Sequence, residues 1–258
     1  MSARDDCEEG TRTLPGRGLE PESRASTSFA TLASSNLAWA SLRDALGLDR
    51  RGAGEHILRM GLRLYHAPRS RSGTALWMLE ELGVPYEITL VEIRRGDGSG
   101  KRDEDNPQPH GKVPSIEHDG VLVHEIPAIA AYLTDAFPRA KLGPAIGDPR
   151  RGPFLSWLAY YGGMLEPSAT SKFLGWEVPR GTVAWVDLDE VLAHIDGTLQ
   201  RQPYIVGEEF TMADVLYGGA FAFLGMNPKV PMTPAMKAYV ERCVARPARA
   251  RATARDDG

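Results

Sequence analysis

"LYHAPRSRSGTALWMLEELGVPYE", residues 64–87, decides how this chain folds. Apolar and polar side chains alternate over residues 62–67, which predicts a strand that ends at Pro68. From residue 72, apolar side chains recur at positions 75, 76, 78, 79 and 82, the spacing of a helix with one buried stripe. Gly83 is a typical residue at the end of a helix, and Pro85 prevents its continuation. The stretch therefore predicts a strand, a short loop and a helix.

The short loop carries two guanidinium groups and two hydroxyl groups, on Arg69, Ser70, Arg71 and Ser72. A plain explanation of Ser72 is that it caps the helix. The alternative is that the loop holds a negatively charged group, because the amino end of a helix carries a partial positive charge. The residues alone leave both interpretations open.

The residues that follow predict further strands and then a second helix. Residues 86–91 alternate as a second strand, and residues 94–109 are polar and Gly-rich, as in a surface connection that has room for a short helix. Residues 115–124 predict two strands joined by a tight turn at Asp119–Gly120, followed by a helix from Ile126. A strand–helix–strand crossover gives a parallel pair, and the hairpin adds antiparallel strands.

Residues beyond 149 show only helical patterns. The clearest helix start combines Thr211 with Asp214, a capping box, and Phe210 with Val215, a hydrophobic staple. The sequence thus predicts an α/β domain with a mixed β-α-β-β-β-α sheet, followed by an all-α helical bundle.

Composition excludes several classes of function. The net charge of −4 gives no reason to expect nucleic acid or an acidic membrane surface as a partner. The chain has two cysteines, Cys7 and Cys243, and no C-x-x-C, so neither a disulfide framework nor a dithiol redox motif is predicted. The histidines lack the spacing of metal ligands, no Ser–His–Asp arrangement is evident, and no apolar run could span a membrane. We expect a cytoplasmic protein without a bound metal.

The first 60 residues differ from the rest. They are rich in charged and small polar residues, so we expect a disordered extension, with a short amphipathic helix possible at 37–48. Two alternatives stay open: a targeting segment, or a true start at Met60 that makes residues 1–59 an artefact of the assigned gene start.

Four segments in this order resemble the cytosolic, bacterial-type glutathione transferase family: "LYHAPRSRSGTALWMLEELGVPYE", "NPQPHGKVPSI", "HEIPAIAAYL" and "YIVGEEFTMADV". The resemblance covers about residues 62–247. It implies a thioredoxin-like glutathione-binding domain at 61–138, a linker at 139–148, an all-helical domain at 149–248 and a disordered tail at 249–258. It also implies a homodimer that binds glutathione and a small hydrophobic electrophile.

The resemblance assigns the sulfur-binding hydroxyl to the loop before the first helix. Neither Tyr nor Cys occupies that loop, so the chain resembles a serine-type member, with Ser70 as the first candidate and Ser72 as the second. An ordinary thiol has a pKa of about 8.5. Lowering it by two units requires about 2.7 kcal/mol, which one charge-assisted hydrogen bond of about 1.5–3 kcal/mol and the helix terminus can supply together.

The same resemblance assigns the residues that contact the rest of the tripeptide. The backbone of Val113 pairs with glutathione beside Pro114, which is cis in the family, and Lys112 or His110 meets the glycine carboxylate.

The resemblance assigns binding of the γ-glutamyl group to Glu125 and to the backbone of Ile126, where the family pattern has a serine. Trp157, Tyr160 and Trp176 are candidates for the second-substrate pocket, and adjacent tyrosines at 160 and 161 cannot both face it from one helix.

The predicted function is glutathione conjugation to electrophiles. The alternatives are a non-catalytic binding or adaptor protein with this fold, and a glutathione-dependent peroxidase or isomerase. A glutaredoxin-like reductase is disfavoured, because the loop has serines where such enzymes need cysteine.

Overall fold

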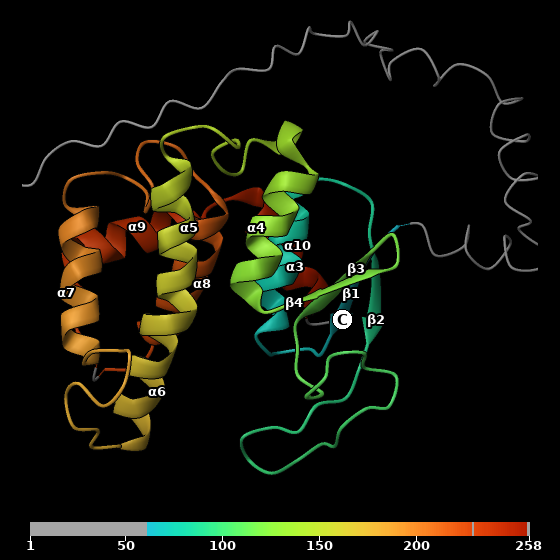
Figure 1. Cartoon of the computed structure of the whole chain (residues 1–258), viewed down its shortest axis with the longest axis horizontal. Helices are drawn as coiled ribbons and strands as arrows, with labels where there is room; N and C mark the ends of the chain where they lie inside the picture. The colour runs from blue at the N-terminus through green and yellow to red at the C-terminus, as the bar shows by residue number, and fades with distance from the viewer. Residues whose placement is uncertain (1–60, 229, 257–258) are drawn as a thin grey trace, which may run out of the picture. The chain divides into compact units, whose positions relative to one another are not determined.

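The structure is a computed structural model that describes residues 61–228 and 230–256 (Figure 1). The predictions made for residues 1–60 and for the last two residues therefore lie outside the described part of the chain. No described helix is long and apolar enough to cross a bilayer.

The α/β domain is built on a four-stranded sheet with the order β2-β1-β3-β4. Strand β1 (Leu62–His66) pairs in parallel with β2 (Glu87–Leu90) and antiparallel with β3 (Ser115–His118), which pairs with β4 (Val121–His124). The helix that connects the parallel pair is α3 (Ser72–Leu82), and α4 (Ile126–Ala136) follows the hairpin. The mixed β-α-β-β-β-α sheet predicted from the sequence is confirmed.

Turn residues end these elements as their types predict. Gly83 ends α3 with a φ of 65°, in the left-handed region that glycine adopts without steric cost. Asp119 and Gly120 turn the β3–β4 hairpin with φ values of 51° and 81°. The connection between β2 and β3 contains no helix, unlike the short helix that the sequence allowed there.

The helical domain follows a 3₁₀ turn, η2 (Pro138–Ala140). Helix α5 (Arg151–Tyr160) passes through a π-helical turn, η3 (Tyr161–Leu165), into α6 (Glu166–Leu174), and α7 (Leu188–Leu199), α8 (Met212–Leu224) and α9 (Pro234–Val244) complete the bundle. The capping box at Thr211 and Asp214 is present, and Asp214 also accepts hydrogen bonds from Ile205 N–H and from the hydroxyl of Tyr239. The predicted helical bundle is thus confirmed.

The C-terminal segment differs from the prediction. Residues 249–256 belong to helix α10 (Pro247–Asp256), not to a disordered tail, and α10 packs on α3 in the first domain. Arg246 and Arg251 bind Glu81 and Glu80 of α3, each at 2.7 Å. The segment is strongly polar, and these ion pairs hold it against α3.

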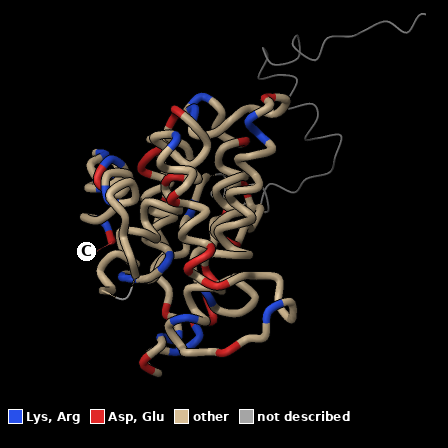
Figure 2. Tube along the Cα trace, turned by 90° about the vertical axis from the view of Figure 1, so that its left-hand side faces the viewer, with Lys and Arg blue, Asp and Glu red and all other residues tan. Residues whose placement is uncertain are grey.

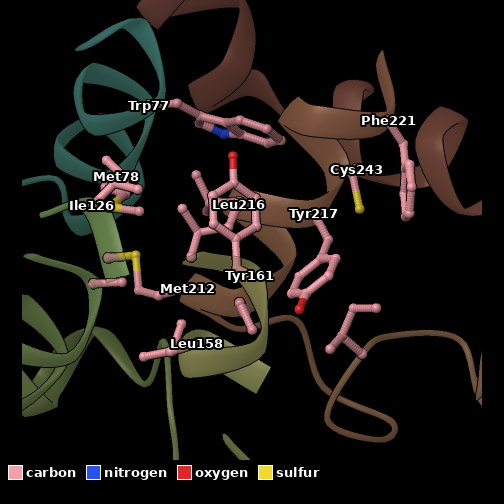
Figure 3. Close-up of a cluster of buried hydrophobic side chains, with 14 of the residues drawn as sticks. Trp77, Met78, Ile126, Leu158, Tyr161, Met212, Leu216, Tyr217, Phe221 and Cys243 are labelled. Carbon is pink, nitrogen blue, oxygen red and sulfur yellow. The ribbon is translucent and has the colours of Figure 1, made fainter. Parts of the chain in front are cut away.

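The two domains share one hydrophobic core. Figure 3 shows Trp77 of α3 above Tyr161 of η3, with Leu216 and Tyr217 of α8 beside them and Cys243 of α9 at the side. All five side chains are less than 9% exposed. In the view of Figure 2, basic and acidic residues are interspersed along the described chain. Because the buried side chains come from both domains, the shared core holds the α/β domain in a defined position on the helical bundle.

Candidate functional site

Strand register brings the predicted site segments to one edge of the sheet. Ser115, the first residue of β3, lies opposite Tyr65 near the end of β1 and opposite His124 at the end of β4. The loop after β1, the segment before Ser115 and the residue after His124 consequently leave the sheet at the same edge. This edge collects Ser70, Val113 and Glu125 although they are far apart in sequence.

Ser70 is half-buried just ahead of the amino end of α3. Its Oγ accepts a hydrogen bond from the N–H of Ser72, at 3.2 Å, and donates to the carbonyl of Ala67, at 2.7 Å. The Oγ of Ser72 lies 2.8 Å away. Ser70 therefore presents a partly accessible hydroxyl at the positive end of a helix.

Ser72 has a different environment. Its side chain is fully buried, and its Oγ accepts from the N–H of Ala67 at 3.1 Å and contacts Nδ1 of His66 at 2.8 Å. It does not cap the helix, because its Oγ accepts from no later amide of the first turn and bonds instead to Ala67, Ser70 and His66. The capping interpretation of Ser72 is therefore wrong: the hydroxyl joins the end of β1 to the start of α3.

Sequence reasoning missed a histidine and a carboxylate at this site. His66 is 1% exposed, and its Nε2 lies 3.1 Å from Oδ1 of Asp256 at the end of α10, without the alignment of a hydrogen bond. The same Oδ1 accepts from the N–H of Arg69 at 3.2 Å. Burial lowers the pKa of His66, although the carboxylate of Asp256 opposes the shift. A Ser–His–Asp arrangement therefore exists, contrary to expectation, and only the packing of α10 reveals it.

The segment predicted to bind the peptide has the expected cis bond before a proline. The Val113–Pro114 bond is cis. Among the described residues, neither backbone group of Val113 has a hydrogen-bond partner. Two buried side chains hold the preceding loop: Asn106 donates to the carbonyl of Lys112 at 3.1 Å, and Oε1 of Gln108 accepts from its N–H at 2.9 Å. The sequence did not predict the role of these two side-chain amides, because buried residues in a polar loop follow no helical or strand periodicity.

The charged candidates lie at the surface. Lys112 and His110 are exposed, and so is Glu125, whose carboxylate is 3.4 Å from Nδ1 of His124. Glu125 precedes α4 with a φ of 68°, a conformation that non-glycine residues rarely adopt. Ile126 is buried and offers no side-chain hydrogen bond. A strained residue held in place by the surrounding fold is typical of binding sites.

Arg71 connects the loop to the helical domain. Its Nε donates to Oε1 of Glu166 in α6 at 2.8 Å. Burial opposes the charge of Arg71, but Glu166 outweighs burial and raises the pKa. Burial also raises the pKa of Tyr161, which interacts with both Arg71 and Glu166.

Of the three aromatic candidates for a second-substrate pocket, Trp157 and Tyr160 are brought together, with ring centres 5.5 Å apart, and Trp176 is not. Trp157 stacks on His194 of α7 with ring centres 5.0 Å apart, and Tyr160 contacts the same imidazole at 5.4 Å. Trp176 lines a cavity of about 290 Å³ beneath the α6–α7 connection. The residue beside Arg71 and Glu166 is Tyr161 instead of Tyr160, because the π-helical turn directs it toward α3 (Figure 3).

This edge can bind an extended, zwitterionic peptide. It offers an unpaired backbone segment at Val113, an exposed carboxylate at Glu125 for an ammonium group, and an exposed cation at Lys112 for a carboxylate. The hydroxyl of Ser70 and the helix terminus favour an anion between them. Within the described ranges, no cluster of three or more His, Cys, Asp or Glu side chains could hold a metal.

Comparison with known proteins agrees with this architecture. Residues 70–136 match the N-terminal domain of glutathione S-transferases, and residues 185–247 match the C-terminal domain, so the two matches cover about half of the chain. Glutathione S-transferase hmp2 of Hypomyces subiculosus is 29% identical over 192 residues, which cover 67% of this chain and 89% of the relative.

Solved structures give the same result. A glutathione transferase from Methylococcus capsulatus is 26% identical, with a TM-score of 0.61 over 76% of this chain and 98% of that one. A sphingomonad glutathione S-transferase complexed with glutathione is 26% identical, with a TM-score of 0.59 over the same shares of both chains. Both domains, in this order and with this sheet, show that the chain belongs to the glutathione S-transferase family.

Proposed function

We propose that this protein conjugates the thiolate of glutathione to small hydrophobic electrophiles. The hydroxyl of Ser70 stabilises the thiolate, and Val113, Glu125 and Lys112 hold the tripeptide at the sheet edge. The observation that carries the proposal is the half-buried Ser70 hydroxyl at the amino end of α3, beside a cis-proline segment with an unpaired backbone. The names of the family relatives support the same reaction.

Ser70 is preferred over Ser72 on the basis of access. Ser72 is fully buried, and its Oγ lies within hydrogen-bond distance of His66, Ala67 and Ser70, so no face of it is left for a ligand. Ser70 can turn its proton from the Ala67 carbonyl toward a sulfur anion, since a charge-assisted hydrogen bond is stronger than a neutral one. The serine acts as a donor and forms no covalent bond with the substrate.

The electrophile enters from the helical domain, on the side of Arg71 and Glu166. We also propose, from family membership, that the protein works as a homodimer in the cytoplasm. These assignments place glutathione on residues 61–138 and the second substrate on residues 149–248.

The Ser70→Ala variant tests the assignment. Loss of a charge-assisted hydrogen bond of about 1.5–3 kcal/mol raises the pKa of bound glutathione by about one to two units. Binding changes little, because the tripeptide contacts remain. The thiolate is measured by ultraviolet difference titration, conjugation with an aryl halide, and binding by retention on immobilised glutathione.

Ser156→Ala, an exposed serine of α5, is the control and keeps the wild-type pKa. The assignment is wrong if Ser72→Ala raises the thiol pKa and Ser70→Ala does not. A wild-type protein that neither binds glutathione nor turns over several electrophiles would rule out the enzyme and favour a binding protein with this fold.

A further inference from the structure

Three side chains of residues 66–72 and one from the end of α10 form one continuous line at the start of α3. Ser70 Oγ lies 2.8 Å from Ser72 Oγ, which lies 2.8 Å from His66 Nδ1. His66 Nε2 in turn lies 3.1 Å from Asp256 Oδ1. The line begins at a half-buried hydroxyl and ends at a carboxylate whose side chain is 22% exposed. Both ends therefore reach the surface, while the two middle groups are sealed from water.

The surroundings hold each member in place. His66 is on β1, and its backbone carbonyl accepts from Val91 beside β2. Asp256 is held by the N–H of Arg69 and lies against Gly73, where an added Cβ would be 3.4 Å from Oδ1. Within the described chain, Asp256 is the charged side chain that acts on the imidazole. The imidazole thus has a hydroxyl at one nitrogen and a carboxylate at the other.

We propose that this line is a proton path from the glutathione thiol to His66, with Asp256 holding the imidazolium. The inference rests on the proposed function, which places the thiol at Ser70. The S–H bond breaks as Ser70 Oγ takes the proton, Ser70 passes its own proton to Ser72, and Ser72 passes its proton to His66 Nδ1. One proton leaves sulfur, one arrives at the imidazole, and nothing is oxidised or reduced.

The shift leaves every group in the orientation that the thiolate requires. After it, Ser70 O–H donates to the sulfur anion, Ser72 O–H donates to Ser70, and His66 N–H donates to Ser72. The positive imidazolium faces the carboxylate of Asp256, which stabilises its charge. Because burial disfavours the charged imidazole, His66 gives its Nε2 proton to the carboxylate of Asp256 once the two groups turn into line, and the exposed side of the carboxylate passes it to solvent. The proton left on Nδ1 must then exchange to Nε2, and the two hydroxyls must turn back, before His66 can accept again. His66 and Ser72 are therefore positioning residues, acting on the substrate through Ser70.

The variant that separates transfer from stabilisation is His66→Asn. The amide oxygen of Asn stands near the place of Nδ1, so it accepts from Ser72 but cannot take a proton. Ser70 and the helix terminus remain, so the equilibrium pKa of the bound thiol stays at the wild-type value. The rate of thiolate formation falls by about a hundredfold, the low end of what a general base contributes. Stopped-flow ultraviolet absorbance after mixing with glutathione, in weak buffer, measures this rate.

Three further variants complete the experiment. Ser72→Ala interrupts the path at its centre and slows thiolate formation to the same extent, and the double variant is no slower than either single one. Asp256→Asn slows it less. His118→Asn is the matched control, since Nδ1 of His118 also contacts a hydroxyl, that of Tyr132 at 2.8 Å, but away from the path. It keeps the wild-type rate.

The outcomes separate the two proposals. A folded His66→Asn or Ser72→Ala variant that forms thiolate as fast as wild type overturns the path and leaves the proposed function standing. A wild-type protein that forms no thiolate overturns both. Circular dichroism identifies a variant that fails to fold, and the remaining variants then decide.

Discussion

Ser70 and Ser72 are two residues apart, yet their hydroxyls have different surroundings. Ser72 points into the junction of β1 and α3 and is fully buried, while Ser70 stays half-buried ahead of the helix. The sequence alone showed that two hydroxyls lie at the start of the helix. It did not show which of them is accessible, because that depends on how the loop packs against His66. The same is true of Tyr160 and Tyr161, whose directions are decided by a π-helical turn.

Glu125 has a strained backbone conformation, and the free energy that this strain costs can be tested by mutation. Its φ of 68° costs about 1–3 kcal/mol for a residue with a side chain. We expect Glu125→Gly to raise the free energy of unfolding by about 1 kcal/mol, because relief of strain is partly offset by the entropy of glycine. The same variant weakens glutathione binding by about tenfold or more, since the ammonium loses its charged partner.

Urea denaturation and titration calorimetry measure the two effects. Asp119→Gly, at the hairpin turn with a φ of 51°, is the control and changes stability without changing glutathione affinity. Unchanged affinity in Glu125→Gly would remove Glu125 from the site.

At the scale of elements, the predictions were most accurate where a local signal was strong. The capping box at Thr211 and Asp214, the left-handed Gly83 and the turn at Asp119–Gly120 all occur as predicted, since each is decided by residues within a few positions. Close helix contacts were not predicted. Helix α8 approaches α9 at Gly218, where only a hydrogen atom fits.

Gly218 and Gly219 provide a matched pair on α8. A Cβ at Gly218 would lie 2.7 Å from Cβ of Cys243, whereas one at Gly219 would meet Oγ1 of Thr74 at an ordinary 3.6 Å. We expect Gly218→Ala to lower the free energy of unfolding by about 1–3 kcal/mol through overpacking. Gly219→Ala raises it by up to about 1 kcal/mol through helix propensity. Thermal and urea unfolding compare the two, and equal effects would contradict the close approach of α8 and α9.

For the whole molecule, the decisive contact joins the last helix to the first one. Glu80 of α3 is 8% exposed and binds Arg251 and Arg255 of α10, as well as the hydroxyl of Tyr86. Burial opposes ionisation of Glu80, but the hydrogen bonds of Tyr86 and Arg251 and the charges of both arginines outweigh it and lower the pKa. Docking of α10 therefore depends on a carboxylate about 170 positions earlier in the sequence.

This carboxylate predicts a pH dependence. A lowered folded-state pKa means that the stabilisation is present above the ordinary value of 4.5 and is lost as the pH falls through the lower folded value. At neutral pH we expect Glu80→Gln to lower the free energy of unfolding by about 1–3 kcal/mol. The difference from wild type shrinks as the pH falls below 4.5.

Urea denaturation over a pH series measures this difference. Glu87→Gln is the control, because the pair of Glu87 with Arg63 is exposed, and such pairs contribute only about 0–1 kcal/mol. A constant difference between Glu80→Gln and wild type at all pH values would exclude ionisation of Glu80 as the cause.

The sequence by itself determined the order of strands and helices, the turn and cap residues, and the segments that form the edge of the sheet. Each of these follows from periodicity or from the conformational limits of neighbouring residues. Only the tertiary structure decided the rest: the packing of α10 on α3, the buried position of Ser72, and the meeting of His66 with Asp256. These depend on contacts between groups up to 190 positions apart, which no local pattern records because the chain must first fold to bring them together.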